Sequence, residues 1–242
     1  MKIWGISDLH LSFQSDKPMD IFGDHWQNHA DQMAAHWDAL VGDNDVVLVP
    51  GDLSWAMKLD EAALDLAWIG ARPGLKILVK GNHDLWWSSI GKVRAALHGS
   101  CIALQNDCYD IGPFVVAGSR CWTSPGSFDY TPHDEKIYER ELGRLRLSLD
   151  KAVEIGQGKP ILAAIHYPPF TVHQENTKFA DLLQQYPVKI CVYGHLHGER
   201  SFKYAFEGER NGITYMMLSC DYLKFKPRLV WPLQTSLSTI SA

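Results

Sequence analysis

The sequence lacks the features that mark several large classes of protein. Its five cysteines form no CxxC pair and follow no regular spacing, which indicates reduced thiols rather than a disulfide framework. No apolar run approaches the roughly 20 residues that a transmembrane helix needs. The net charge of -5 leaves no basic surplus to hold a nucleic acid. Internal repeats and low-complexity linkers are also missing, so a globular fold is expected.

The length and composition suit one large domain. The chain has 242 residues, of which 46% are hydrophobic, enough to form a substantial core. We expect a single domain over residues 1–233, followed by a polar, Ser/Thr-rich tail over residues 234–242. The opening residues, MKIWGISDLH, already resemble a strand, so we expect no signal peptide and a cytoplasmic location.

Apolar runs and amphipathic stretches alternate along the chain. The predicted strands are residues 2–7, 45–49, 76–79, 102–105, 114–118, 160–165, 189–193, 213–219 and 228–232. The predicted helices are residues 25–41, 59–69, 90–97 and 134–155. This alternation predicts an α/β domain with at least one partly parallel sheet. In such sheets ligands bind beyond the carboxyl ends of the strands.

The longest predicted helix, residues 134–155, shows two distinct faces. Its predicted apolar stripe consists of Leu142, Leu145, Leu149 and Val153. The opposite face carries charged residues of both signs, namely Glu139, Arg140, Glu141, Arg144 and Arg146. We interpret this second face as exposed to solvent, because mixed charges at helical spacing are typical of a solvated surface.

Seven side chains that could bind metal ions follow five separate apolar runs. Each run has a few Ile, Leu or Val residues, then a small or polar residue, then the candidate ligand. The runs are ISDLH with Asp8 and His10, VLVPGD with Asp52, ILVKGNHD with Asn82, ILAAIHYPP with His166, and ICVYGHLH with His195 and His197. Five such runs in succession predict strands that deliver these side chains to a common point.

The chemistry of the seven candidates favours two metal ions rather than one. A set of carboxylate, amide and imidazole ligands without cysteine suits Mn, Fe, Zn, Co or Ni. Seven protein ligands are too many for one catalytic metal, which must keep a position open for water or substrate. Two divalent ions sharing a bridging carboxylate would use all seven. With two carboxylates the site would carry about +2, which attracts anions such as phosphate.

The ordered motifs resemble those of the calcineurin-like metallophosphoesterases. The matching segments are Asp8-x-His10, Gly51-Asp52, Gly81-Asn82-His83-Asp84, His166 and Gly194-His195-x-His197, in the order in which the family has them. Each motif alone occurs often by chance, whereas the ordered set is specific. The resemblance implies a four-layer αββα sandwich with two mixed β-sheets and a dinuclear metal site at the strand ends. It also implies hydrolysis of a phosphate ester by a hydroxide that bridges the metals.

The resemblance implies a role for each motif residue. One metal would be held by Asp8, His10 and His197, the other by Asn82, His166 and His195, with Asp52 bridging them. His83 would stay off the metals and face the leaving oxygen, as a general acid or as a stabiliser of charge.

Two segments depart from the pattern of the protein phosphatases in this family. Those relatives carry GDxxDRG and RGNHE, whose arginines grip phosphate, whereas this chain has GDLSWAM and KGNHD. Trp55 replaces the second Asp and Lys80 replaces the Arg, so we do not expect a Ser/Thr protein phosphatase. The missing Asp pairs with the equivalent of His83 in those relatives. Asp84 or Asp60 is the candidate substitute, and we count Asp84 with His83 as a catalytic candidate.

A small phosphorylated substrate is the expected ligand, and three residues are candidates to contact it. Asn82 lies within a motif, Arg120 follows a predicted strand, and Tyr167 follows His166. Several aromatic residues near the motifs could stack on a base, an aryl group or a sugar, or could simply fill the core; they are Trp55, Trp86, Trp87, Trp122 and Tyr167. Because a diester carries less charge than a monoester, the missing arginines favour a diester slightly.

Two alternatives of another kind stay open at the level of sequence. Some proteins of this fold are partner-binding scaffolds that have lost ligands or the catalytic histidine, but this chain retains every ligand position and His83. A redox enzyme with two iron ions is the second alternative. Such enzymes draw carboxylate-rich ligands from a helical bundle, whereas here the ligands end strands and are mostly imidazoles.

Overall fold

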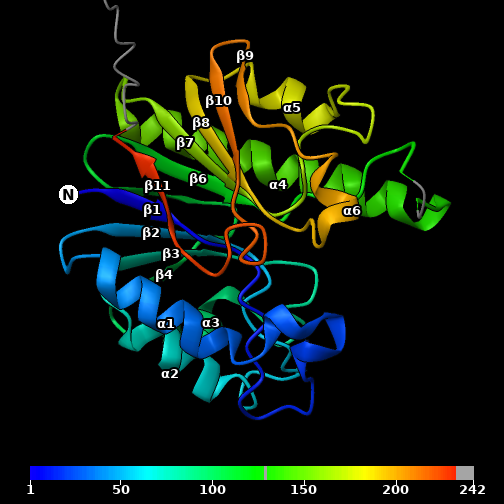
Figure 1. Ribbon diagram of the computed structural model, residues 1–242. Coiled ribbons are helices and arrows are strands. Elements are labelled where there is room, and N and C mark those ends of the chain that lie inside the picture. The colour runs from blue at the N-terminus through cyan, green and yellow to red at the C-terminus, as the bar shows by residue number, and fades with distance from the viewer. Residues whose placement is uncertain (128–129, 233–242) are drawn as a thin grey trace, which may run out of the picture.

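The computed structural model describes residues 1–127 and 130–232, and it forms four layers. Two β-sheets pack face to face, and helices cover the outer face of each sheet (Figure 1). This arrangement confirms the predicted αββα sandwich. The predicted polar tail, residues 234–242, lies outside the described residues. Over the described ranges, no helix has the length and apolar character needed to cross a membrane.

The first sheet has five strands in the order β11-β1-β2-β3-β4. Its strands are β1 (Ile3–Gly5), β2 (Val46–Pro50), β3 (Leu75–Val79), β4 (Cys101–Ala103) and β11 (Arg228–Trp231). All neighbours are parallel except β11, which pairs antiparallel with β1. The central strand β2 is buried along its whole length, as expected of a parallel strand covered on both faces.

The second sheet has six strands in the order β5-β6-β7-β8-β10-β9. Its strands are β5 (Cys108–Asp110), β6 (Val115–Ser119), β7 (Ile161–Ile165), β8 (Val188–Tyr193), β9 (Gly208–Arg210) and β10 (Ile213–Met217). The four central strands are parallel, and β5 and β9 add antiparallel edges. The sequence did not predict β5 or β9, because each has three residues and neither is fully buried.

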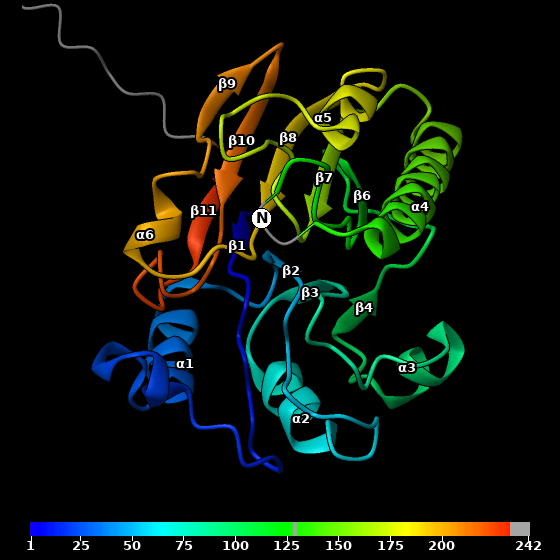
Figure 2. The same ribbon diagram turned by 90° about the vertical axis from the view of Figure 1, so that its right-hand side faces the viewer.

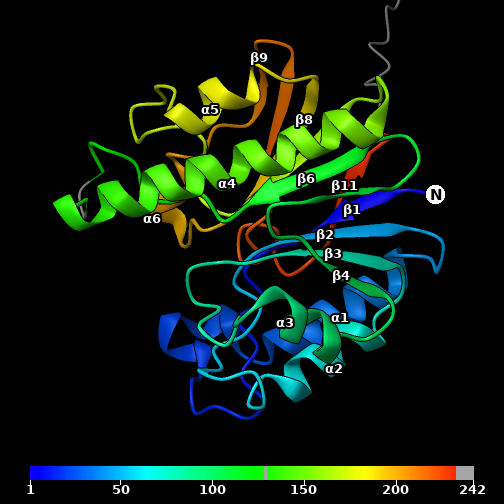
Figure 3. The same ribbon diagram turned by 180° about the vertical axis from the view of Figure 1, so that it is seen from behind.

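Helices cover the two sheets on opposite sides of the molecule (Figures 2 and 3). The first sheet carries α1 (His29–Leu40), α2 (Ala63–Ala71) and α3 (Ile90–Ala96), and the second carries α4 (Pro132–Gly156) and α5 (Lys178–Leu183). A short helix, α6 (Glu199–Phe202), follows β8. The predicted helix 25–41 is shorter than expected. Asn28 has a left-handed backbone (φ 51°), which separates α1 from two preceding 3-10 turns, η1 (Met19–Phe22) and η2 (Asp24–Trp26).

Three apolar layers hold the elements together. One lies between the sheets and includes Leu48, Ile77 and Val192, and the other two lie under the helices. The stripe predicted on α4 is correct at Leu145 and Leu149, which are buried, but wrong at Val153, which is 47% exposed. The buried face of α4 turns away from Val153, because the helix packs along β5, β6 and β7.

Candidate metal centre

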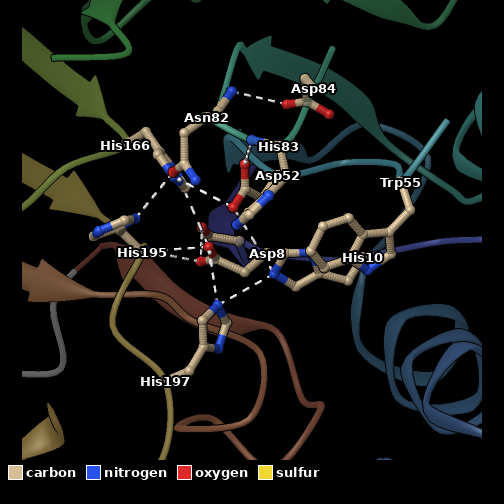
Figure 4. Close-up of polar contacts among 12 residues, drawn as sticks. Asp8, His10, Asp52, Trp55, Asn82, His83, Asp84, His166, His195 and His197 are labelled. Carbon is tan, nitrogen blue, oxygen red and sulfur yellow. Dashed lines mark hydrogen bonds and ion pairs between the residues drawn. The ribbon is translucent and has the colours of Figure 1, made fainter. Parts of the chain in front are cut away.

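The structure brings the seven predicted ligands together at the line where the two sheets meet (Figure 4). Asp8 and His10 follow β1, Asp52 follows β2, Asn82 follows β3, His166 follows β7, and His195 and His197 follow β8. Both sheets therefore point the carboxyl ends of their parallel strands at one place. This position is where open α/β sheets bind ligands.

One group of donors consists of Asp8, His10 and His197, whose ligand atoms lie within 4.8 Å of one another. Nε2 of His10 lies 3.2 Å from Nε2 of His197. The same His197 nitrogen lies 3.5 Å from Oδ1 of Asp8. These are the three residues that the family resemblance assigned to the first metal.

A second group of donors consists of Asp8, Asp52 and His166. Asn82 joins it, because its Oδ1 lies 2.7 Å from Nε2 of His166 and 3.0 Å from Nδ1 of His195. Asp8 thus belongs to both groups, although the family resemblance assigned it to one metal only. The two groups together contain all seven candidates.

The Asp52 carboxylate, a member of the second group, also approaches the first group. Its Oδ2 is 3.8 Å from Nε2 of His10 in the first group and 3.5 Å from Nε2 of His166 in the second. Its Oδ1 accepts a hydrogen bond of 2.8 Å from the backbone N–H of His83. Asp52 is thereby held in a position from which one oxygen reaches both groups.

The contacts around His166 leave one of its ring nitrogens available to bind a metal ion. Nδ1 of His166 lies 3.0 Å from the carbonyl oxygen of Pro50, an acceptor that requires a proton on Nδ1. Nε2 of this neutral ring then carries a lone pair, yet it faces the amide oxygen of Asn82. Two acceptors in contact repel each other unless a cation lies between them. The donor set therefore fits a divalent ion.

The electrostatics of the site also favour added positive charge. Burial lowers the pKa of His166 to about 4, so this ring stays neutral and able to bind a metal. Burial would raise the pKa of Asp8, but the hydrogen bond from His197 and the charges of the neighbouring histidines lower it below its ordinary value. Burial would lower the pKa of His197, but its hydrogen bonds to Asp221 and Asp8 raise that pKa to about 10.

Glycine precedes several ligands because other site residues come very close to the backbone there. A Cβ added at Gly81 would lie 2.1 Å from Oδ1 of Asp52. A Cβ added at Gly194 would lie 2.3 Å from Oδ2 of Asp8. Any other residue at these positions would displace a candidate ligand, which explains the GN and GH pairs of the motifs.

Four of the seven candidate ligands have a left-handed backbone that non-glycine residues seldom adopt. They are Asp8 (φ 59°), His10 (φ 45°), Asp52 (φ 52°) and His195 (φ 74°). Such conformations cost of order 1–3 kcal/mol each in some regions of backbone space, and they gather at sites where the surrounding structure dictates the geometry. These backbone conformations thus lower the stability of the fold, but they direct the four side chains toward the site.

His83 lies beside the ligands and packs against Trp55. The ring centroids of His83 and Trp55 are 4.3 Å apart, and the Trp55 ring also stacks on His10 at 4.8 Å. Burial, followed by the charge of His197, lowers the pKa of His83. The tryptophan that replaces the phosphatase Asp is therefore in contact with two imidazoles of the site.

Asp84 holds two loops together from a fully buried position. Its carboxylate accepts hydrogen bonds from the backbone N–H groups of Leu53, Ser54 and Gly81 and from the indole N–H of Trp86. Among the described residues, this carboxylate makes no hydrogen bond to the ring of His83. Its partners are thus the backbones that carry the GD and GN motifs. Asp60, the other candidate partner of His83, is exposed.

The Arg120 side chain forms a salt bridge with Glu141 and does not extend toward the candidate ligands. Its guanidinium lies 2.9 Å from Glu141 of α4 and stacks over the Trp122 ring at 4.3 Å. Glu141 is buried and also pairs with Arg144 and Arg140. The prediction that Glu141 belongs to a solvated face was therefore wrong, because periodicity does not show a buried ion pair with a residue from another element.

The aromatic residues near the motifs divide into two kinds. Trp86 and Trp87 are buried in the core. Tyr167 and Trp122 instead line a cavity that also touches His195, and the Tyr167 ring lies 4.0 Å from the His195 ring. Tyr167 is thus placed beside the candidate metal centre, and its contact with a substrate stays a prediction.

Asp221 is a residue of the site that the sequence analysis missed. Its Oδ1 lies 3.0 Å from Nδ1 of His197, and its Oδ2 accepts a hydrogen bond from the backbone N–H of Gly198. A carboxylate in this position fixes the orientation of a metal-binding imidazole. The signal was present, because the run YMMLSCD, which begins within β10 and ends at Asp221, has the same pattern as the five motif runs.

The comparison with protein families agrees with this geometry. The family described as calcineurin-like phosphoesterase matches residues 1–199. The chain belongs to this family. The resemblance inferred from the motifs is thereby confirmed, and with it the coarse expectation of a metal-binding Asp and His cluster in an α/β sandwich.

Individual relatives of this calcineurin-like chain are distant or partial. The Gene 66 proteins of Mycobacterium phages L5 and D29 are 36% identical over 81 residues and 39% identical over 84 residues, each spanning 34% of this chain. The alignments span 39% and 40% of those relatives' own length. The solved structure of the phosphopantetheinyl hydrolase PptH from Mycobacterium tuberculosis is similar with a TM-score of 0.60 and 16% identity, over 96% of both chains. At that identity the likeness supports the fold alone.

Proposed function

We propose that this protein is a dinuclear metal-dependent phosphoesterase. The observation that carries the proposal is the pair of donor groups that share Asp8, with Asp52 in the second group and close to the first. Two divalent ions bound there would polarise the phosphoryl group and lower the pKa of a water nucleophile. The scaffold alternative is disfavoured, because all seven donors and His83 are present and converge.

The ring of His83 is proposed to assist the leaving group. It borders the candidate ligands but belongs to neither donor group, so it is available to a substrate. Its backbone is tied to Asp52 and its ring packs against Trp55, which together set its position. From there it either donates a proton to the departing oxygen or stabilises the charge that develops on it. Asp84 would support this arrangement by holding the loop.

A diester is the proposed substrate class. Lys80, in the KGNHD segment, and Arg120, the candidate phosphate contact, are both engaged elsewhere, Arg120 with Glu141 and Lys80 with the carbonyl of Trp87. A monoester dianion is usually bound by such cations, whereas a diester carries a single charge. Two cavities also border the donor set, one at His83 and one at His195. This arrangement suits a phosphate that carries two substituents.

The test is hydrolysis of bis-p-nitrophenyl phosphate and p-nitrophenyl phosphate by the protein loaded with Mn, Co, Ni or Zn. We expect turnover of both compounds and a higher kcat/KM for the diester. Asp52→Asn is the matched control, since it changes one oxygen to an amide and should abolish activity with every metal. If no metal supports hydrolysis of either compound, the proposed function is wrong. A clear preference for the monoester would refute the diester assignment alone.

A further inference from the structure

An apolar cavity of about 350 Å³ lies beside His83. Its volume is within the roughly 300–1,000 Å³ of small-molecule sites. Four of its lining side chains are apolar, namely Met19, Phe22, Trp26 and Trp55. The other lining residues, on the side of the donor groups, are His10, His25, His83, His197, Gly198 and Asp221. Burying an apolar group there removes its surface from water, which favours binding without any polar contact. The cavity therefore suits an aliphatic or aromatic group.

The other cavity, of about 260 Å³, lies at His195 and has a different character. Its walls include the rings of Tyr167 and Tyr204, together with hydroxyl groups that the first cavity lacks. These hydroxyls belong to Ser124, Ser127, Ser201, Thr123 and Thr171. They share the walls with apolar side chains, namely Trp122, Pro168, Phe170, Val172 and Leu196. Since hydroxyl side chains can donate and accept hydrogen bonds, this cavity suits a polar substituent.

His83 distinguishes the two cavities chemically, because it lines the apolar cavity and not the polar one. A group that assists departure must lie within reach of the oxygen that leaves. The alcohol that leaves is then the one in the apolar cavity. Trp55 contacts His83 from the wall of this cavity, so a bound apolar group would pack against the same ring that positions the imidazole.

We propose that the apolar cavity binds the leaving alcohol, and that the substrates are phosphodiesters of one apolar and one polar alcohol. This inference rests on the proposed function. Water adds its oxygen to phosphorus, the bond from phosphorus to the apolar alcohol's oxygen breaks, and that oxygen takes up a proton. The products are the free apolar alcohol and the monoester of the polar alcohol, which the second cavity retains.

Phe22 offers a substitution at this cavity that leaves the donor set intact. It lies in η1, is 60% exposed and lines the mouth of the cavity, so its removal should not disturb the core. Tyr204, at 38% exposed, is the matched aromatic residue of the opposite cavity. Phe22→Ala and Tyr204→Ala therefore form a pair that differs mainly in which cavity loses a ring.

The test uses a diester that joins 3-phenylpropanol and glycerol, two primary alcohols whose intrinsic tendencies to leave are similar. We expect the products 3-phenylpropanol and glycerol phosphate to exceed the alternative products, glycerol and 3-phenylpropyl phosphate, by about tenfold or more. Phosphorus NMR measures the ratio of the two phosphate monoesters. Phe22→Ala should reduce kcat/KM for this release about tenfold, while Tyr204→Ala, which removes a ring from the cavity of the retained alcohol, should still release 3-phenylpropanol in excess. Equal release of both alcohols, or an excess of free 3-phenylpropanol that Phe22→Ala does not reduce, would overturn the inference.

A binding experiment without metal separates this inference from the proposed function. We expect 3-phenylpropanol to shift the indole NMR signals of Trp26 and Trp55 in the metal-free protein, and to shift them less in Phe22→Ala. Absence of such a shift in the wild type overturns the inference even if the enzyme hydrolyses nitrophenyl esters. If the shift occurs but no metal supports hydrolysis of any ester, the proposed function is wrong and the leaving-group assignment falls with it.

Discussion

Replacing Asp84 would distinguish a structural carboxylate from a catalytic one. The side chain is fully buried and accepts four hydrogen bonds, at 2.9 Å from Leu53, 3.1 Å from Ser54, 2.8 Å from Gly81 and 2.9 Å from the Trp86 indole. Alanine would leave four buried donors without an acceptor. Each such group costs about 1–3 kcal/mol, and water entering the space would relieve part of this. We therefore expect Asp84→Ala to lose about 3–5 kcal/mol of unfolding free energy.

An asparagine at the same position should cost less. Its amide oxygen can keep the three donors that now bind Oδ1, and its NH₂ group would face only the backbone N–H of Gly81. The Gly81 N–H and the buried NH₂ group beside it would both lack an acceptor, which predicts a loss of about 1–3 kcal/mol, less than for alanine. The exposed Asp60→Ala is the control and should change the stability by less than about 0.5 kcal/mol.

Urea denaturation of the metal-free protein measures these differences without any contribution from bound ions. The expected order of stability is wild type and Asp60→Ala, then Asp84→Asn, then Asp84→Ala. If Asp84→Ala unfolds at the same urea concentration as the wild type while its turnover collapses, the structural reasoning is refuted. Asp84 would then act on the reaction, as the sequence suggested.

Four further predictions concern the site and the fold. His83→Ala should lower turnover by about 10²–10⁴-fold, while elemental analysis should still find two metal ions per protein. Loss of metal from this variant would contradict the role of His83 outside the donor groups. Asp52→Asn should lose both ions together in the same analysis, whereas a full metal content would argue against a bridging position. Asp221→Asn should weaken metal affinity by about 10–100-fold in a chelator competition, and an unchanged affinity would exclude an orienting role. Burial would raise the pKa of Asp45, but the three N–H groups that donate to its carboxylate lower this pKa below the ordinary 3.8. The ionised Asp45 therefore stabilises the fold above pH 3.8, and this contribution is lost as the pH falls through the lower pKa of the folded state. The urea midpoints of wild type and Asp45→Asn should accordingly differ at about pH 7 and converge near pH 2.

The parts of the fold that the sequence predicted are those with a local signature. The central strands are short apolar runs that end in a polar residue, and the ligands belong to those same runs. Knowing that parallel strands end at one edge was enough to expect that Asp52 and Asn82, after the neighbouring strands β2 and β3, lie close together. The approach of His166, which follows a strand of the other sheet, was expected from the family resemblance. The three-residue strands β5 and β9 have no such pattern, because their neighbours in the sheet rather than their own residues hold them in place.

The features that the sequence could not predict depend on partners from distant segments. In the sequence, Glu141 resembles any glutamate on a helix surface, and only the fold shows that Arg120, at the end of β6, lies against it. The same is true of Asp84, whose partners include a loop about 30 residues earlier in the chain. Periodicity shows which face of an element is apolar, but it does not show which polar groups are buried together. Such contacts follow only from the tertiary arrangement.

The division of the candidate ligands between the sheets has a consequence for assembly. Each donor group takes residues from both halves: Asp8 and His10 come from the first sheet and His197 from the second, and Asp52 likewise lies opposite His166. The chain crosses from one sheet to the other once between β4 and β5 and returns only for β11. Neither half could complete a coordination sphere by itself, so cations would cross-link the halves and strengthen their association. Two fragments cut within the β4–β5 connection should accordingly complement each other more tightly when metal is supplied.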